Sequence, residues 1–240
     1  MNALSYMDQN LLRIRAGIDA AMQRRRQELS DTDVLLLAAI KYTDARHVNY
    51  LHRHLHVHDV GENRVQQLLE RWDSLDREGL RIHFIGKLQS NKVKYIIDKV
   101  CMIHSLDSSS LAREIERQAA KHGLVMDVLV EINSGREENK SGLDPLEVEE
   151  FCKSLGDFPH IRLRGFMTMA PRCENAEQYR VYFGETYRLC QEIWTEKLQR
   201  TDKPILSMGM SESFEPAIEE GSSIVRVGRA LFAEPTETTG

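Results

Sequence analysis

The sequence has few cysteines, few aromatic residues and no excess of positive charge. Its 240 residues include four cysteines, and aromatic residues make up 7% of the chain. No two cysteines are close enough for a paired-cysteine zinc site, and their scatter is typical of reduced thiols in a cytoplasmic protein. The 32 basic and 37 acidic residues give a net charge of −5, which argues against a general nucleic-acid-binding protein. No apolar run approaches the roughly 20 residues of a membrane span, and the N-terminus lacks the apolar core of a signal peptide.

The sequence also has no internal repeat and no linker rich in proline and glycine, so we expect a single domain. Acidic residues such as Asp8 and Glu28 interrupt the arginine-bearing N-terminal segment, which argues against a transit peptide. Apolar residues recur there at helical spacing. We therefore expect residues 1–33 to contain a helix that packs on the main domain, residues 34–233 to form that domain, and residues 234–240 to be a flexible tail.

Short apolar runs alternate with segments of helical spacing along the main domain. Eight runs are expected as strands: Val34–Ile40, His56–Val60, Arg81–Ile85, Cys101–Ser105, Val125–Ile132, Ile161–Met167, Pro204–Ser207 and Ile224–Val227. Helices are expected at 44–54, 65–75, 91–99, 108–122, from 145, 174–200 and 214–219. This alternation predicts an α/β fold, a (β/α)8 TIM barrel with an additional N-terminal helix; strand counting leaves a doubly wound open sheet as the alternative.

A lysine, Lys41, directly follows the first apolar run, Val34–Ile40. Such a side chain can simply extend to solvent. Alternatively, an apolar surrounding disfavours the charged ammonium, and a neutral amine can attack an aldehyde to form a Schiff base. That chemistry suits pyridoxal phosphate (PLP) or the carbonyl substrate of an aldolase-like enzyme.

Glycine and serine residues follow the last two expected strands, with Ser207 and Gly209 after the seventh and Gly228 after the eighth. In barrels, the loops after these two strands commonly bind a phosphate group. Glycine lets the backbone N–H groups approach an anion closely. The alternative is that Gly209 and Gly228 are simple turn glycines.

The histidines offer weaker signals. His52, His54, His56 and His58 alternate, which on a strand would place them on one face as for a metal site. The run crosses an expected helix–strand junction, so we predict no metal site. His83 lies inside an apolar strand, where a core histidine is the simple interpretation, although its position near the strand end also allows contact with a ligand.

Several motifs together resemble a known family. Residues Ile82–Lys92 (IHFIGKLQSNK) resemble the H-F-I-G-x-L-Q-x-N-K signature of the YggS/PROSC family, the pyridoxal phosphate homeostasis proteins. Gly61–Gln66 (GENRVQ) is similar to that family's G-E-N-x-V-Q, and Asn139–Gly142 (NKSG) to its K-x-G loop. The family's C-terminal pattern is matched by Leu206–Ser211 and Val225–Gly228.

The resemblance extends from about residue 34 to 233, and it implies the fold of the alanine racemase N-terminal domain without a second domain. It implies that Lys41 holds PLP as a Schiff base and that Arg226 faces the pyridine nitrogen. The other residues that it places at the cofactor are Asn63, His83, Met167, Ser207, Met208, Gly209, Gly228 and Arg229. Of these, Ser207, Gly209 and the backbone around Gly228 and Arg229 would hold the phosphate.

Some residues depart from the family pattern. Ile40 stands where Ser or Thr is usual before the lysine, and Arg229 stands where a small residue usually helps to bind the phosphate. Ala233 replaces a glycine, and the histidine run at 52–58 is not a family feature. These departures bear on how strongly PLP is retained more than on where it binds.

The resemblance implies a PLP-binding protein of vitamin B6 and amino-acid/keto-acid homeostasis, with no catalytic residues and no established turnover. Arg226 fits this role, because a guanidinium only donates hydrogen bonds and would keep the pyridine nitrogen unprotonated, which makes the ring a poorer electron sink. A racemase-type PLP enzyme, a Schiff-base aldolase and an interaction scaffold are the alternatives. The partners expected are PLP and PLP-dependent apoenzymes that receive it, with no nucleic acid and no membrane, and the protein is expected to be a monomer.

Overall fold

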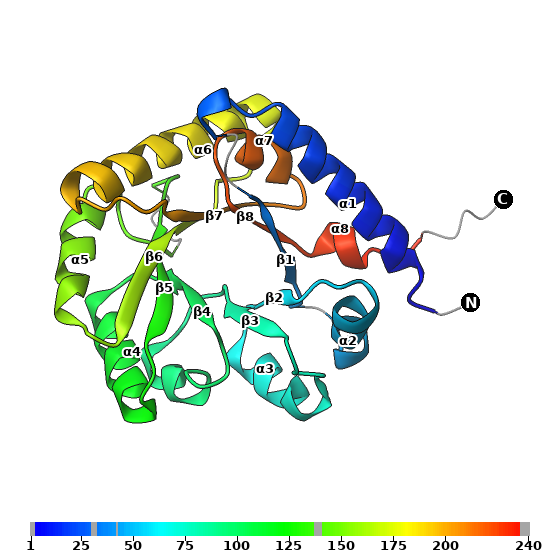
Figure 1. Ribbon diagram of the computed structural model, residues 1–240, viewed down its shortest axis with the longest axis horizontal. Coiled ribbons are helices and arrows are strands. Elements are labelled where there is room, and N and C mark those ends of the chain that lie inside the picture. The colour runs from blue at the N-terminus through cyan, green and yellow to red at the C-terminus, as the bar shows by residue number, and fades with distance from the viewer. Residues whose placement is uncertain (1–2, 30–32, 42, 137–140, 236–240) are drawn as a thin grey trace.

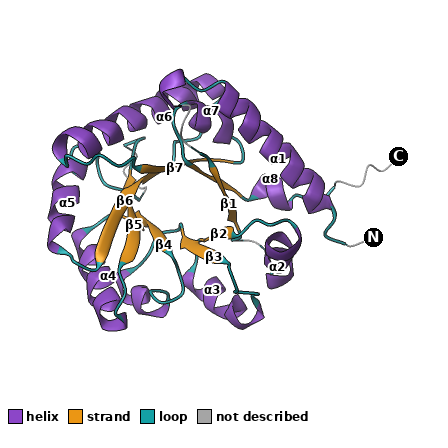
Figure 2. Cartoon of the chain, in the orientation of Figure 1, coloured by secondary structure: helices purple, strands orange, loops and turns teal. Residues whose placement is uncertain are grey.

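Eight parallel strands close into a barrel with helices on its outside (Figures 1 and 2). The computed structural model describes residues 3–29, 33–41, 43–136 and 141–235. The strands are β1 (Leu35–Ala39), β2 (Asp59–Glu62), β3 (Arg81–Phe84), β4 (Met102–Leu106), β5 (Met126–Ile132), β6 (Ile161–Thr168), β7 (Ile205–Met210) and β8 (Ile224–Val227). They pair in chain order, and Leu35 of β1 pairs with Ile224 of β8. This closing pair confirms the TIM barrel and excludes the open sheet.

The outer layer is made of helices that alternate with the strands. They are α1 (Tyr6–Gln23), α2 (Ala45–His54), α3 (Val65–Arg71), α4 (Ser109–His122), α5 (Val148–Ser154), α6 (Ala176–Gln191), α7 (Phe214–Glu219) and α8 (Arg229–Phe232). Side-chain caps begin three of them: Asp44 accepts a hydrogen bond from the His47 backbone N–H, Ser108 accepts one from Leu111, and Asn175 accepts one from Gln178. Each cap satisfies an N–H group that has no partner inside its helix.

The expected N-terminal helix is confirmed as α1. It buries one apolar stripe, which includes Met7, Leu11 and Ile14, and it lies against α7 and α8 (Figure 1). The boundary that we expected between residues 33 and 34 stays a prediction. Of the expected flexible tail, residues 236–240 lie outside the described part of the chain.

Several elements differ in bounds or type from the expectation. The second strand begins at Asp59 rather than at His56, because His56 has a left-handed φ of 53°, which a strand does not accommodate. The expected helix at 174–200 changes at Glu192 into a π-helical segment that buries Trp194. Residues expected as a helix at 91–99 instead form a 3-10 segment, Ser90–Tyr95, followed by turns.

Side chains that point into the barrel form two small apolar clusters, apart from the large core between the strands and the helices. One cluster contains Leu37, Ile85 and Ile224, and the other contains Met102, Leu129 and Met167. The barrel is therefore packed rather than hollow, as is usual for eight strands. Buried polar side chains also occur on these strands, and they form the site described below.

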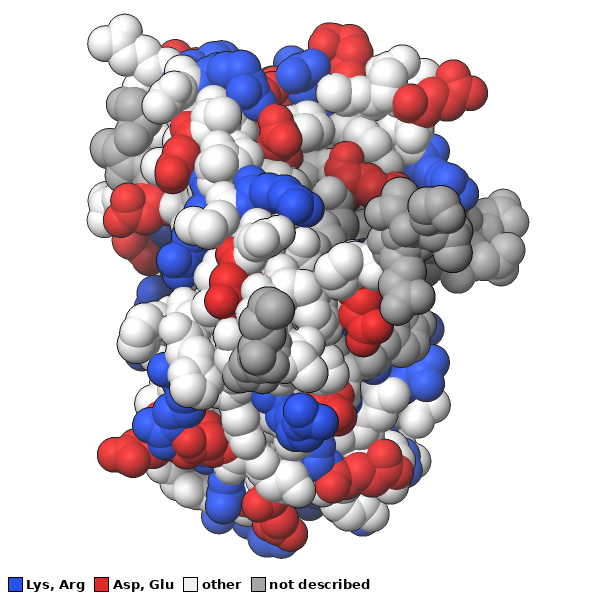
Figure 3. Space-filling model, turned by 90° about the vertical axis from the view of Figure 1, so that its right-hand side faces the viewer, with Lys and Arg blue, Asp and Glu red and all other residues white. Residues whose placement is uncertain are grey.

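The surface carries charges of both signs. On the face formed by α1, α8 and α2, acidic and basic side chains are interspersed (Figure 3). Within the described ranges, no helix has the length and apolar character needed to cross a membrane.

Candidate functional site

Most of the predicted site residues lie at or near the C-terminal ends of the strands. Lys41 follows β1, Asn63 follows β2 and Gly228 follows β8, whereas Ser207 and Arg226 lie within β7 and β8. All strands of a parallel barrel end at the same mouth, which is where active sites of such barrels are found. The structure therefore brings these residues to one end of the molecule.

Arg226, the next-to-last residue of β8, is buried and bonded to three oxygen atoms. Its Nη1 donates to the carbonyl oxygen of Ser207 at 2.6 Å and to the Ser207 hydroxyl at 2.7 Å, and its Nη2 donates to the Thr168 carbonyl at 2.9 Å. Burial lowers the pKa of Arg226 to about 10, with Glu131 acting in the opposite direction. The guanidinium is thus charged at neutral pH, and its plane is held by β6 and β7.

Glu131, the next-to-last residue of β5, is the buried acid that accompanies Arg226. Burial, followed by the nearby charge of Asp107, raises the pKa of Glu131 to about 7, although Arg226 and Lys87 act to lower it. Opposite charges therefore compensate this carboxyl only in part. A buried group that titrates near neutral pH, close to the ends of the barrel strands, is a feature of functional sites.

His83 lies inside the barrel, and both of its ring nitrogens are engaged by protein groups. Its Nδ1 is 2.9 Å from Nε2 of His104, and its Nε2 is 3.1 Å from a carboxylate oxygen of Asp59. Nδ1 of His104 in turn lies 3.1 Å from the Ser207 hydroxyl. His83 is thus connected to Arg226 through His104 and Ser207, and its predicted direct contact with a cofactor stays a prediction.

The turn that presents Lys41 is held from two neighbouring elements. The carbonyl oxygen of Ile40, one residue before the lysine, accepts hydrogen bonds from Arg71 of α3 at 3.0 Å and from the Thr43 backbone at 3.2 Å. Arg71 also forms a 3.3 Å ion pair with the fully buried carboxylate of Glu62 in β2. Lys41 itself is exposed at the rim, and its backbone direction is set by this anchored carbonyl.

Asn63 brings an unsatisfied polar atom to the same end of the barrel. Its side-chain oxygen is buried and has no hydrogen-bond partner among the described residues. Its backbone N–H donates to the Glu62 carboxylate at 2.6 Å. The neighbouring Gly86 has to be glycine, because a Cβ there would lie 2.2 Å from the Asn63 carbonyl oxygen.

The rim loops after β7 and β8 are tied to each other. The Ser211 hydroxyl accepts a hydrogen bond from the Ala230 backbone N–H at 3.3 Å, and the exposed Arg229 forms an ion pair with Glu212. A Cβ at Gly228 would lie 2.7 Å from the Ala39 carbonyl oxygen. At Gly209, where φ is +91°, a Cβ would lie 2.6 Å from that of Ala217. Both glycines are therefore already required by the packing of the chain on itself.

The two predicted methionines differ in position. Met167 packs inside the barrel with Met102 and Leu129, next to the polar groups. Met208 belongs to the core between the barrel and the helices, because it alternates along β7 with the inward-facing Ser207. Any contact of Met208 with a cofactor would therefore come from its backbone.

The histidine run at 52–58 lies apart from these residues. Nε2 of His52 is 2.8 Å from the Glu78 carbonyl oxygen, and its Nδ1 is 2.8 Å from Nδ1 of His58. In the described part of the chain, no group of three or more His, Cys, Asp or Glu side chains could hold a metal ion. Two residues of the matched K-x-G loop, Asn139 and Lys140, lie outside the described residues.

Sequence reasoning missed four polar residues of the site: Asp59, Arg71, His104 and Glu131. Asp59, His104 and Glu131 carried a signal, since each is a charged or polar residue within an expected strand. Arg71 carried none, because an arginine on an expected helix is ordinarily exposed.

Comparison with known proteins assigns the chain to a family. The model of the alanine racemase N-terminal domain matches residues 16–235. The pyridoxal phosphate homeostasis protein of Aquifex aeolicus is 47% identical over 174 residues, which are 72% of this chain and 75% of that protein. The chain belongs to the pyridoxal phosphate homeostasis protein family.

Other members of this family match over nearly the whole chain. The homologue from Escherichia coli is 31% identical over 236 residues, or 97% of each chain. Among solved structures, PipY of Synechococcus elongatus, described with PLP bound, has a TM-score of 0.77 and 28% identity over 89% of this chain and 100% of its own. Alanine racemase of Clostridium difficile has a TM-score of 0.70 but only 18% identity, over 93% of this chain and 57% of its own, so it shares the fold.

Proposed function

We propose that this protein binds PLP at the C-terminal mouth of its barrel, with Lys41 as the covalent anchor, and that it acts in PLP homeostasis. Family membership supports the proposal, as does the PLP-bound structure of the relative PipY. The observation that carries it is the buried Arg226, held by Ser207 and Thr168 at the mouth that Lys41 borders.

The donor set of this mouth fits the cofactor. A guanidinium has five N–H donors, and three of those of Arg226 are used by Ser207 and Thr168, which leaves two for a ligand. The nitrogen of a pyridine ring can accept a hydrogen bond from one of these two N–H groups. The amide oxygen of Asn63, which has no hydrogen-bond partner among the described residues, adds an acceptor that a ligand can satisfy.

When bound, PLP supplies an aldehyde that condenses with amines. The Nζ of Lys41 would form a bond to the aldehyde carbon, and the carbonyl oxygen would leave as water. Arg226 would donate to the ring nitrogen and keep it unprotonated. The backbone around Gly209 and Gly228 would hold the phosphate.

We further propose that the protein carries PLP without turning over amino acids. The permanently donating Arg226 would withhold the proton that makes the ring a strong electron sink. This supports reversible storage and release to PLP-dependent apoenzymes rather than racemase chemistry. Steady conversion of free amino acids by the purified protein would favour the racemase alternative. A cytoplasmic location and a monomeric state stay predictions.

The role of Lys41 is tested by the visible spectrum of the protein with added PLP. Lys41→Ala should abolish the absorption band of the covalently bound cofactor, because no other amine would replace Lys41. Lys121→Ala is the matched control, since Lys121 lies at the end of α4 that leads toward the start of β5, at the opposite end of the barrel. If both variants keep the band, the assignment of Lys41 is wrong.

A further inference from the structure

A continuous chain of hydrogen bonds crosses the barrel interior from Arg226 to Asp59. Nη1 of Arg226 is 2.7 Å from the Ser207 hydroxyl, which is 3.1 Å from Nδ1 of His104. Nε2 of His104 is 2.9 Å from Nδ1 of His83, and Nε2 of His83 is 3.1 Å from Oδ1 of Asp59. The five residues come from five different strands, and all are buried.

The two ends of this chain determine its direction. Arg226 can only donate hydrogen bonds. Burial raises the pKa of Asp59, but hydrogen bonds from His83 and Arg81 outweigh this effect, and the pKa lies below its ordinary value. Asp59 is therefore ionised at neutral pH and can only accept.

The three groups between these ends each have one hydrogen to donate along the chain when they are neutral. Burial, more than any other cause, lowers the pKa of His104 well below its usual value, so His104 is neutral. With a donor at one end and an acceptor at the other, one arrangement satisfies every link. The Ser207 hydroxyl donates to His104, Nε2–H of His104 donates to His83, and Nε2–H of His83 donates to Asp59.

We infer that Asp59 is a positioning residue for the cofactor site, because it gives the hydrogen-bond chain one direction and so commits the Ser207 hydrogen to His104, which fixes the hydroxyl that accepts from Arg226. The inference rests on the proposed function, in which Arg226 contacts the pyridine nitrogen. Asp59 touches neither Arg226 nor the mouth; it acts through two histidines and a serine.

The direction of the hydrogen-bond chain determines whether the Ser207 hydroxyl can donate to a phosphate group. Its single hydrogen is used by His104, so the hydroxyl has no hydrogen for a phosphate group. The phosphate must take its donors from the rim instead. Ser211 is placed for this, since its oxygen accepts from Ala230 and its own hydrogen is not used by that bond. Ser207 therefore belongs with Arg226 at the ring end of the cofactor.

Reversal of the hydrogen-bond chain would require a change in the charge state of His83. If His83 carried both ring protons, His104 would have to accept at Nε2 and donate from Nδ1 to Ser207. The Ser207 hydroxyl would then be able to donate its hydrogen to a ligand at the mouth. The two arrangements differ in the tautomer of His104, which can be measured without any cofactor.

Nitrogen-15 NMR of the histidine rings in the protein without PLP tests the direction of the chain. The signals of His83 and His104 are assigned with His83→Gln and His104→Gln. At pH 7.5 both rings should be neutral with the proton on Nε2. A proton on Nδ1 of His104, or a doubly protonated His83, would overturn the inference. Because no PLP is present, this result does not depend on the proposed function.

The release of PLP from the loaded protein tests the consequence for the site. Asp59→Asn introduces an NH2 group where only an acceptor fits, so the chain loses its single direction, and PLP release should become about tenfold faster. Arg162→Gln is the matched control: Arg162 of β6 is similarly exposed and forms the same kind of ion pair with Asp127 of β5, outside the hydrogen-bond chain. Its effect should be less than about threefold. Equal release from the two variants would overturn the positioning role, whereas failure of the unmodified protein to bind PLP would overturn the proposed function alone.

Discussion

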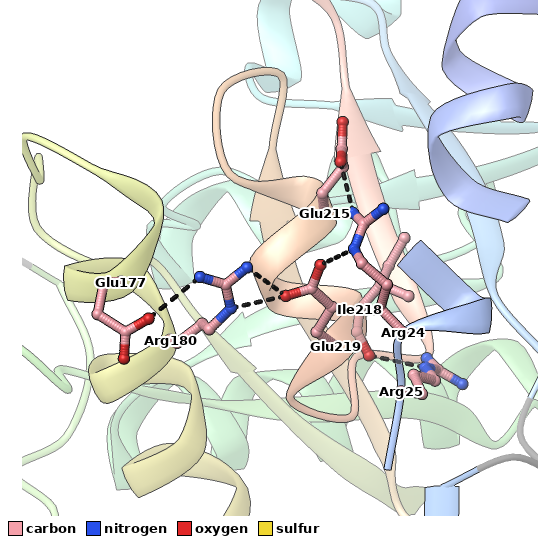
Figure 4. A network of polar contacts seen from close by, with 7 residues as sticks. All are labelled: Arg24, Arg25, Glu177, Arg180, Glu215, Ile218 and Glu219. Carbon is pink, nitrogen blue, oxygen red and sulfur yellow. Dashed lines mark hydrogen bonds and ion pairs between the residues drawn. The ribbon is translucent and has the colours of Figure 1, made fainter. Parts of the chain in front are cut away.

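Two buried carboxylates of this protein differ in how their negative charge is compensated. Glu219 of α7 lies in the helical layer, where Arg24 and Arg180 each approach its carboxylate oxygens at 2.6 Å (Figure 4). Glu131 of β5 lies close to Arg226, but the hydrogen bonds of that arginine go to Ser207 and Thr168. Its charge is compensated only in part, and its pKa is raised to about 7, chiefly by burial.

This difference indicates that the charge of Glu219 has a structural role, whereas the carboxyl of Glu131 has a functional one. The pairs around Glu219 join α1, α6 and α7, so they hold the N-terminal helix and the helix after β7 in place (Figure 4). Among the described residues, no hydrogen bond or ion pair of the Glu131 side chain joins two elements in this way. An incompletely paired buried acid costs stability, and proteins retain such groups mainly at functional sites.

The largest effect expected concerns the pH dependence contributed by Glu131. Its folded-state pKa of about 7 lies above the ordinary 4.5, so the folded state binds the proton more tightly than the unfolded state. The contribution of Glu131 to stability is therefore fully present below pH 4.5 and is lost as the pH rises through 7. A shift of this size corresponds to about 3 kcal/mol. Denaturant unfolding without PLP should show the unmodified protein losing about 2–3 kcal/mol relative to Glu131→Gln between pH 5 and pH 8. Parallel curves for the two proteins would contradict the comparison.

Part of this arrangement could be predicted from the sequence. Apolar runs followed by Lys41, Asn63 and Gly228 indicated a barrel with a site at the strand ends, and the motifs around His83 indicated the family. The contacts that organise the site join residues far apart in sequence, as His104 and Ser207 are, and depend on which strands face each other across the closed barrel. Spacing within one strand carries no information about them.

The second prediction concerns Glu219, where removal of the charge should destabilise the protein, in contrast to Glu131. Glu219→Gln should lower the free energy of unfolding by about 2 kcal/mol at neutral pH, because two hydrogen bonds to charged groups are weakened. Glu177→Gln is the matched control, since Glu177 pairs with the same Arg180 but is exposed. Its effect should stay below about 0.5 kcal/mol. Equal effects of the two variants on denaturant unfolding would show that burial of Glu219 adds nothing.

The smallest effect is expected at the rim. Arg229 and Glu212 are both exposed, so Arg229→Ala should change the free energy of unfolding by less than about 1 kcal/mol. Release of PLP should change by less than about threefold, because the guanidinium points to Glu212 rather than to the phosphate. A tenfold faster release would instead show that this side chain turns inward to hold the cofactor.

The most direct test of the account is to identify the amine that holds PLP. The loaded protein is reduced with borohydride, which makes the covalent link permanent, and the modified peptide is identified by mass spectrometry. We expect one modified residue, Lys41. Modification of Lys87 or another surface lysine in place of Lys41 would contradict it.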